Sequence, residues 1–76
     1  MKAYILIDVR TGEIEQVVHH LKRVSGVVDA HMTFGPYDAV AVVEAADVAG
    51  LGKTLASGIQ PIPGVLETLT CLAVEG

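Results

Sequence analysis

The chain has 76 residues, of which 51% are hydrophobic and 18% are charged, and its formal net charge is −4. A domain this small cannot bury so much apolar material in its own core, so we expect it to associate with a second copy. The five basic residues are scattered, which argues against direct binding to nucleic acid. No apolar run approaches the roughly 20 residues of a membrane helix. Cys71 is the single cysteine, which excludes an internal disulfide and fits a cytoplasmic protein.

The first third of the chain predicts a strand followed by a helix. Apolar residues alternate along residues 2–9, as in a strand with one buried face. Apolar residues within 14–21 then fall at i, i+3, i+4 and i+7, which is the spacing of one helix stripe. Thr11 is the expected N-cap of this helix, and Gly26 is expected to follow its end.

The middle of the chain predicts a β-hairpin. Residues 27–34 form the first expected strand, with every second residue from Val28 onward on its apolar face. Gly35 and Pro36 mark the turn. Residues 38–45 form the next expected strand, which is apolar on both faces.

A second helix and a fourth strand are expected to follow. Asp47 is the expected N-cap of a helix that carries Val48, Leu51 and Leu55. The boundaries of this helix stay open, because the two glycines within it weaken it. Two prolines then break the chain, and residues 64–74 form the last expected strand.

The order of these elements, β-α-β-β-α-β, indicates an α+β protein with the ferredoxin-like fold. SGVVDAHMT at residues 25–33 resembles PGVLETLTC at residues 63–71, which is consistent with two βαβ halves. Right-handed crossovers place both helices on one face of the four-stranded antiparallel sheet and leave the other face apolar and uncovered. We therefore expect two sheets to pack face to face around a two-fold axis, as a dimeric α+β barrel.

The segment GLGKT, residues 50–54, looks like the end of a phosphate-binding P-loop. The full motif needs a glycine where this chain has Asp47, and an acid there would face the phosphates. We interpret the segment as an amphipathic helix with an exposed Lys53, and expect no bound nucleotide.

Metal ligands and nucleophiles are not found in a recognisable setting. His19 and His20 are adjacent on a helix and point about 100° apart, so they do not chelate one metal together. His31 would meet a second ligand only across an interface. Cys71 is expected to be a small buried hydrophobe. We therefore predict no metal, no cofactor and no catalytic residue.

Three phrases together resemble a known family. They are VSGV at residues 24–27, GPYD at residues 35–38, and IPGV at residues 62–65 ahead of a strand with two threonines. The chain resembles, over essentially its whole length, the effector-binding (RAM, ACT-like) domain of the Lrp/AsnC family of amino-acid-responsive transcription regulators. Full regulators of that family begin with a helix-turn-helix domain. Residues 1–76 begin at the first strand, so we expect one stand-alone domain without a DNA-binding domain.

The resemblance implies dimers that assemble into an octamer-like ring and bind a small effector, an amino acid, between dimers. It places the site at Gly35, Tyr37 and Asp38. Asp38 would accept from the ammonium group, and turn N–H groups would hold the carboxylate. Thr68 and Thr70 would add hydroxyl groups. A full-length Lrp/AsnC regulator is the expected protein partner, with no direct contact to nucleic acid or membrane.

Each of these residues also has a simpler structural role open to it. Asp38 can satisfy turn N–H groups, Tyr37 can anchor an interface, and threonine suits any strand. The expected function is a non-catalytic amino-acid sensor, with two alternatives. One is a small dimeric-barrel enzyme of the monooxygenase or isomerase type, which needs His31 in an enclosed pocket. The other is an assembly module without a ligand.

Overall fold

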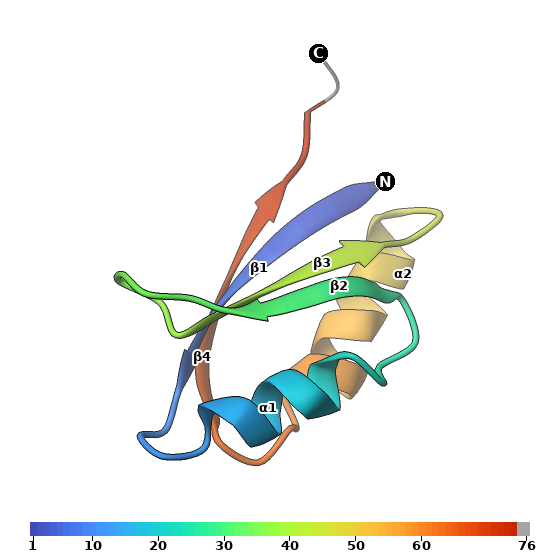
Figure 1. The fold of residues 1–76 in the computed structure, drawn as a ribbon. Helices are drawn as coiled ribbons and strands as arrows, with labels where there is room; N and C mark the ends of the chain where they lie inside the picture. The colour runs from blue at the N-terminus through green and yellow to red at the C-terminus, as the bar shows by residue number, and fades with distance from the viewer. Residues whose placement is uncertain (75–76) are drawn as a thin grey trace.

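The computed structural model describes residues 1–74 and contains a four-stranded sheet with a helical layer on one side (Figure 1). The elements in chain order are β1 (Lys2–Val9), α1 (Ile14–Leu21), β2 (Val27–Met32), β3 (Ala39–Glu44), α2 (Val48–Lys53), a π-helical segment η1 (Thr54–Ile59) and β4 (Val65–Leu72). The strand order is β2-β3-β1-β4, and every neighbouring pair is antiparallel. The predicted ferredoxin-like fold is confirmed.

The core lies between the helical layer and the central strands. Along β1 the side chains on the helix side are buried, because successive residues of a strand point to opposite faces. The buried hydrophobic residues are Ala3, Ile5, Ile7, Val9, Val17, Leu21, Ala30, Ala39, Ala41, Val43, Leu51, Ile59 and Ile62. Members from both halves of the chain form one cluster, so the two βαβ halves stabilise each other.

The hairpin strands are shorter than predicted. β2 ends at Met32 and β3 begins at Ala39, so the connecting loop takes residues that the sequence pattern assigns to both strands. A register shift near the start of β2 also interrupts its alternation. Val28, predicted to share the apolar face of Ala30, is consequently 55% exposed, whereas Ala30 is buried.

The two helices begin differently. Thr11 is not an N-cap, because the chain is still turning at Gly12, whose φ of 87° lies in the left-handed region that favours glycine. Glu13 takes the N-cap position of α1 without a side-chain capping bond. The prediction for the second helix is confirmed, since the Asp47 carboxylate accepts a hydrogen bond of 2.7 Å from the Gly50 N–H.

The second helix widens into a π-helical segment after Lys53. The Gln60 N–H donates to the Leu55 carbonyl at 2.9 Å, which is the i to i+5 spacing of a π-helix. Gly58 lies so close to the chain after α1 that a Cβ there would be 2.6 Å from Val24 Cγ1. Among residues 1–74, no helix has the length and apolar character needed to cross a membrane.

Candidate functional site

The loop between β2 and β3 contains the predicted binding residues. Thr33 donates across this loop twice, from its backbone N–H to the Asp38 carbonyl at 3.0 Å and from its hydroxyl to the Tyr37 carbonyl at 2.7 Å. Gly35 has a φ of 136°, which residues with a side chain rarely adopt. These bonds close the loop into a defined turn that projects from one end of the sheet (Figure 1).

Asp38 links this loop to the central strand β1. Its backbone N–H donates to the Ile7 carbonyl at 2.9 Å, and its carboxylate oxygen Oδ2 accepts from the Val9 N–H at 2.7 Å. The simpler structural role of Asp38 is therefore present in the structure. Within residues 1–74 the other oxygen, Oδ1, accepts no hydrogen bond, so one oxygen of the carboxylate is available to a ligand.

The two aromatic side chains near the loop have different surroundings. Tyr37 is half-buried, whereas Phe34 is fully exposed. The sequence pattern predicts Phe34 at the end of a strand, whereas the structure places it in the loop between β2 and β3. The sequence signal for this position is the Gly-Pro pair that follows it directly, because such pairs mark turns.

Thr68 and Thr70 lie on β4, and their cross-strand partners on β1 are core residues. Ala39, the residue after Asp38, pairs with Ile7, and Ile7 pairs with Thr68. Two strand spacings, roughly 10 Å, therefore separate the backbone of Thr68 from the start of β3. One chain does not bring these threonines together with the Asp38 carboxylate.

Thr68 instead contributes to a groove beside the end of the π-helical segment. The Gln60 side-chain amide Nε2 donates to the Thr68 hydroxyl at 3.3 Å. The groove has a volume of about 310 Å³ and is lined by Gln60, Val65, Leu66, Glu67 and Thr68. Gln60 is not among the residues singled out from the sequence, where its only signal is its position before the PIPG phrase.

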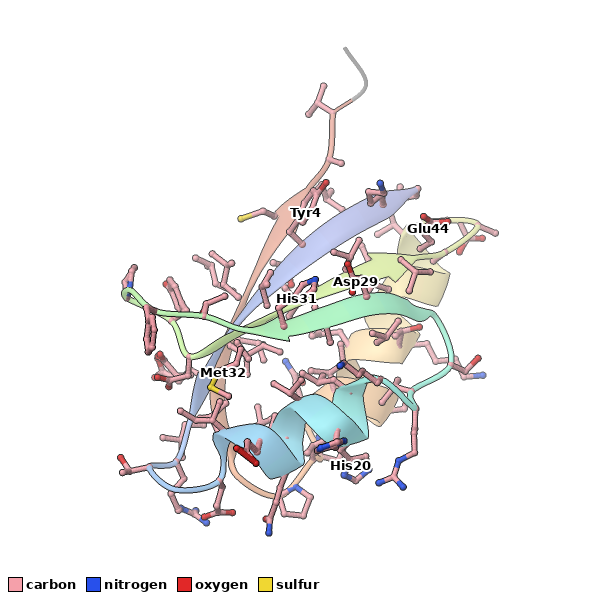
Figure 2. All side chains as sticks on the ribbon, viewed as in Figure 1. Tyr4, His20, Asp29, His31, Met32 and Glu44 are labelled. Atoms are coloured by element: carbon pink, nitrogen blue, oxygen red, sulfur yellow. The ribbon has the colours of Figure 1, made fainter. Side chains whose placement is uncertain are left out.

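The sheet face away from the helices is exposed and apolar at its centre, and we call it the open face. By strand register it comprises Lys2, Tyr4, Leu6 and Asp8 of β1, Asp29 and His31 of β2, Val40, Val42 and Glu44 of β3, and Glu67, Leu69 and Cys71 of β4. Figure 2 shows Tyr4, Asp29, His31 and Glu44 on this side of the sheet. The prediction of an uncovered apolar face is confirmed for the single chain.

Comparison with known protein families decides what kind of domain this is. The Lrp/AsnC ligand-binding domain matches residues 2–75, which is nearly the whole chain. The chain belongs to this family. The family supplies the ligand-binding part of transcription regulators, so the resemblance seen in the VSGV, GPYD and IPGV phrases is confirmed.

This Lrp/AsnC domain is 33% identical over 63 residues to the HTH-type transcriptional regulator Ptr1 of Methanocaldococcus jannaschii, covering 83% of the chain and 43% of Ptr1. The crystal structure of TTHA0845 from Thermus thermophilus has a TM-score of 0.92 and 31% identity, covering 99% of this chain and 94% of that one. The transcriptional regulator NMB0573 of Neisseria meningitidis, solved as a complex with L-Met, shares the fold. Its TM-score is 0.85 with 12% identity, covering 97% of this chain and 49% of that one. The domain thus spans less than half of Ptr1.

The open face of this Lrp/AsnC domain carries a polar pair on β2. His31 Nε2 lies 2.9 Å from Asp29 Oδ2, and Asp29 Oδ1 accepts from the Ala30 N–H at 3.0 Å. The hydrogen bond with His31 is the main cause that lowers the pKa of Asp29 below its ordinary value. The His31 side chain is 62% exposed, so the single chain does not give it the enclosed pocket that a catalytic role requires.

Cys71 does not have the buried position that we predicted. It is exposed on the open face, where it pairs with Tyr4. The reason is that β4 is an edge strand of the sheet and its open-face side chains have no covering layer in the single chain.

The remaining sequence motifs do not form a metal or phosphate site. Within residues 1–74, no group of three or more His, Cys, Asp or Glu side chains is placed to hold a metal ion. In the GLGKT segment the Gly50 N–H, which a P-loop would offer to phosphate, is bound to the Asp47 carboxylate. Lys53 is exposed at the end of α2, as we expected.

Proposed function

We propose that this Lrp/AsnC domain is a non-catalytic sensor that binds a small effector, an amino acid, between copies of the chain. The observation that carries this proposal is the Asp38 carboxylate. The Val9 N–H holds one oxygen of this carboxylate, and the second oxygen is available to accept from an ammonium group. The complex of NMB0573 with L-Met, on the same fold, supports an amino acid as the class of effector.

The proposed assembly begins with a second copy that covers the open face. Tyr4 and Leu69 are 41% and 49% exposed in the single chain, and with Leu6, Val40 and Val42 they form the apolar part of the open face. Burying such a patch against its own two-fold copy removes apolar area from water on both chains and gives the expected dimer of facing sheets. These dimers would then associate further into a ring, octamer-like in size.

Association between dimers also accounts for the separation of the predicted site residues. Asp38 and the groove of Gln60 and Thr68 are two strands apart in one chain. We therefore place the effector between the β2–β3 loop of one copy and the groove of another, where the hydroxyl of Thr68 adds a polar contact. Thr70, two residues further along β4, would add a second hydroxyl beside the groove. This arrangement makes effector binding depend on assembly.

We further propose that the domain acts in transcription regulation by co-assembly with a full-length Lrp/AsnC regulator. Its match to Ptr1, an HTH-type regulator, covers 83% of this chain and supports a partner of that kind. The proposed contribution of residues 1–76 is ligand binding rather than contact with DNA, because a net charge of −4 with five basic residues disfavours phosphate.

A thermal-shift screen of the twenty amino acids tests this function. We expect one amino acid or a related group to raise the melting temperature, since a ligand at a hundred times its Kd stabilises by about 2.7 kcal/mol. Asp38→Asn should abolish the shift, and Glu15→Gln, on the exposed side of α1, should retain it. If no amino acid shifts the wild-type melting temperature at millimolar concentration, the sensor proposal is wrong.

A further inference from the structure

The Asp29–His31 pair lies on the surface that the proposed dimer buries. The two residues are two positions apart on β2, and they therefore share a sheet face. Their cross-strand partners on β3 are Val42 and Val40, at the apolar centre of the open face. Figure 2 shows both side chains on the same side of the sheet as Tyr4. A second copy on this face would take the pair out of water.

The charges on the open face are unbalanced when His31 is neutral. The face carries four carboxylates, from Asp8, Asp29, Glu44 and Glu67, and one ammonium group, from Lys2. Two facing copies place these excess negative charges in one interface. A protonated imidazole on each copy would offset part of that excess and would leave the Asp29 carboxylate paired with a cation.

The other elements near the Asp29–His31 pair contribute few titratable groups. β3 and β1 present Val40, Val42, Leu6 and Tyr4 toward it. From α1, Glu15, His19 and Lys22 line a groove with His31, and Lys22 also acts on Asp29. Glu15 and Lys22 carry opposite charges and offset each other. His19 is the other histidine of this groove, and α1 lies on the opposite side of the sheet from the open face.

We propose that His31 makes the face-to-face assembly sensitive to pH, with the protonated imidazole favouring the dimer. This inference rests on the assembly in the proposed function. Imidazole changes charge between pH 5 and 8, whereas the Asp29 carboxylate remains ionised over that range. Above this range His31 is neutral, and Lys22, the smallest of the influences on Asp29, would be the cation left near the covered carboxylate. A poorly compensated charge in an interface opposes association.

The expected effect follows from proton linkage. Formation of the dimer takes up as many as two protons, one at each His31. If each paired imidazole favours association by about threefold, as for a partly exposed ion pair, the association constant is about tenfold larger at pH 6 than at pH 8.

Sedimentation equilibrium of the intact chain at pH 6 and pH 8 measures this effect directly. We expect tighter association at pH 6 for the wild type and for His19→Gln, and nearly equal association at both pH values for His31→Gln. If the dimer does not dissociate at accessible concentrations, the concentration dependence of the urea unfolding midpoint gives the same comparison, since monomer and dimer are then linked through unfolding.

A second variant separates this inference from the assembly that it requires. Leu6→Glu places a charge at the centre of the open face and should reduce association at both pH values. Association unaffected by Leu6→Glu, or a wild type that is monomeric at both pH values, would overturn the proposed interface. Association that Leu6→Glu weakens, but whose pH dependence is absent or is unchanged in His31→Gln, overturns the role of His31 alone.

Discussion

The Asp38 carboxylate accepts a hydrogen bond of 2.7 Å from the Val9 N–H, and this bond connects two residues 29 positions apart in the chain. It fixes the base of the β2–β3 loop to the end of the central strand. Asp38 thus holds its own loop in place at the same time as it offers an oxygen to the proposed effector.

Two substitutions at Asp38 should separate these two roles. Asp38→Asn keeps a side-chain oxygen for the Val9 N–H but removes the negative charge, so the free energy of unfolding should change little while effector binding is lost. Asp38→Ala leaves the partly buried N–H without that acceptor, which costs about 1–3 kcal/mol. Urea unfolding and calorimetric titration with the amino acid found in the screen measure the two effects. Equal stability of both variants would contradict a structural role for the bond.

Gly64, in the IPGV phrase, should not tolerate a side chain. Its φ is 99°, and a Cβ there would lie 3.1 Å from both Val17 Cγ2 and Glu13 Oε1. Gly64→Ala should therefore lower the free energy of unfolding by about 1–3 kcal/mol, through backbone strain and crowding against α1. Gly52→Ala is the matched control, because a Cβ at Gly52 meets nothing within 4 Å. Urea unfolding of both variants makes the comparison.

The Asp29 carboxyl should titrate below its ordinary value of 3.8 in the folded chain, because the His31 side chain donates to its ionised form. Because the pKa of Asp29 is lower in the folded chain than in the unfolded chain, the Asp29–His31 bond contributes to the free energy of unfolding. This contribution is fully present at pH values above the unfolded-state pKa of the carboxyl group. This contribution is lost as the pH falls through the lowered folded-state value. Carboxyl carbon chemical shifts, followed by NMR from pH 6 to pH 2, measure the titration.

His31→Ala removes the main cause of the lowered pKa of Asp29, so the titration midpoint should rise in this variant. His20→Ala provides the control, since His20 lies on α1, away from Asp29 (Figure 2). An Asp29 midpoint that is the same in the wild type and in His31→Ala would show that the hydrogen bond does not form in solution.

Asp47 should stabilise the second helix through its cap. Its carboxylate satisfies the Gly50 N–H at 2.7 Å, at the start of a segment that two glycines weaken. Asp47→Ala should lower the free energy of unfolding by about 1 kcal/mol, and Asp47→Ser should restore most of it. Thr11→Ala, at a position that caps no helix, should change stability far less in the same measurement.

The fold could be predicted from the sequence because its main signals are local and repeated. Alternation along β1, helical spacing in α1 and the capping Asp47 each act within a few residues, and all are seen in the structure. The β-α-β-β-α-β order then leaves few topologies, since crossovers are right-handed. The open face follows from the same argument.

Several details could not be predicted, because they depend on contacts between distant residues. The exposure of Val28 results from the pairing register of β2 on β3. The bond from Val9 to Asp38 needs the third strand beside the first, and the contact of Gln60 with Thr68 needs the fourth strand in place. The apolar neighbours of Cys71 predict a core position, but this pattern does not distinguish an interior strand from an edge strand, and β4 is an edge strand.

β4 pairs with β1 from Val65 to Leu72, yet Leu66, Leu69 and Leu72 on it are each about half exposed. Detaching this edge strand would uncover less buried apolar area than detaching β1 or β3, so its local opening should cost less free energy than opening either of them. In the proposed assembly, a second copy or an effector that covers β4 would supply the burial that the strand lacks by itself. Occupancy of the site would then be transmitted as a loss of local fluctuation in β4, with no rigid movement of the remaining sheet.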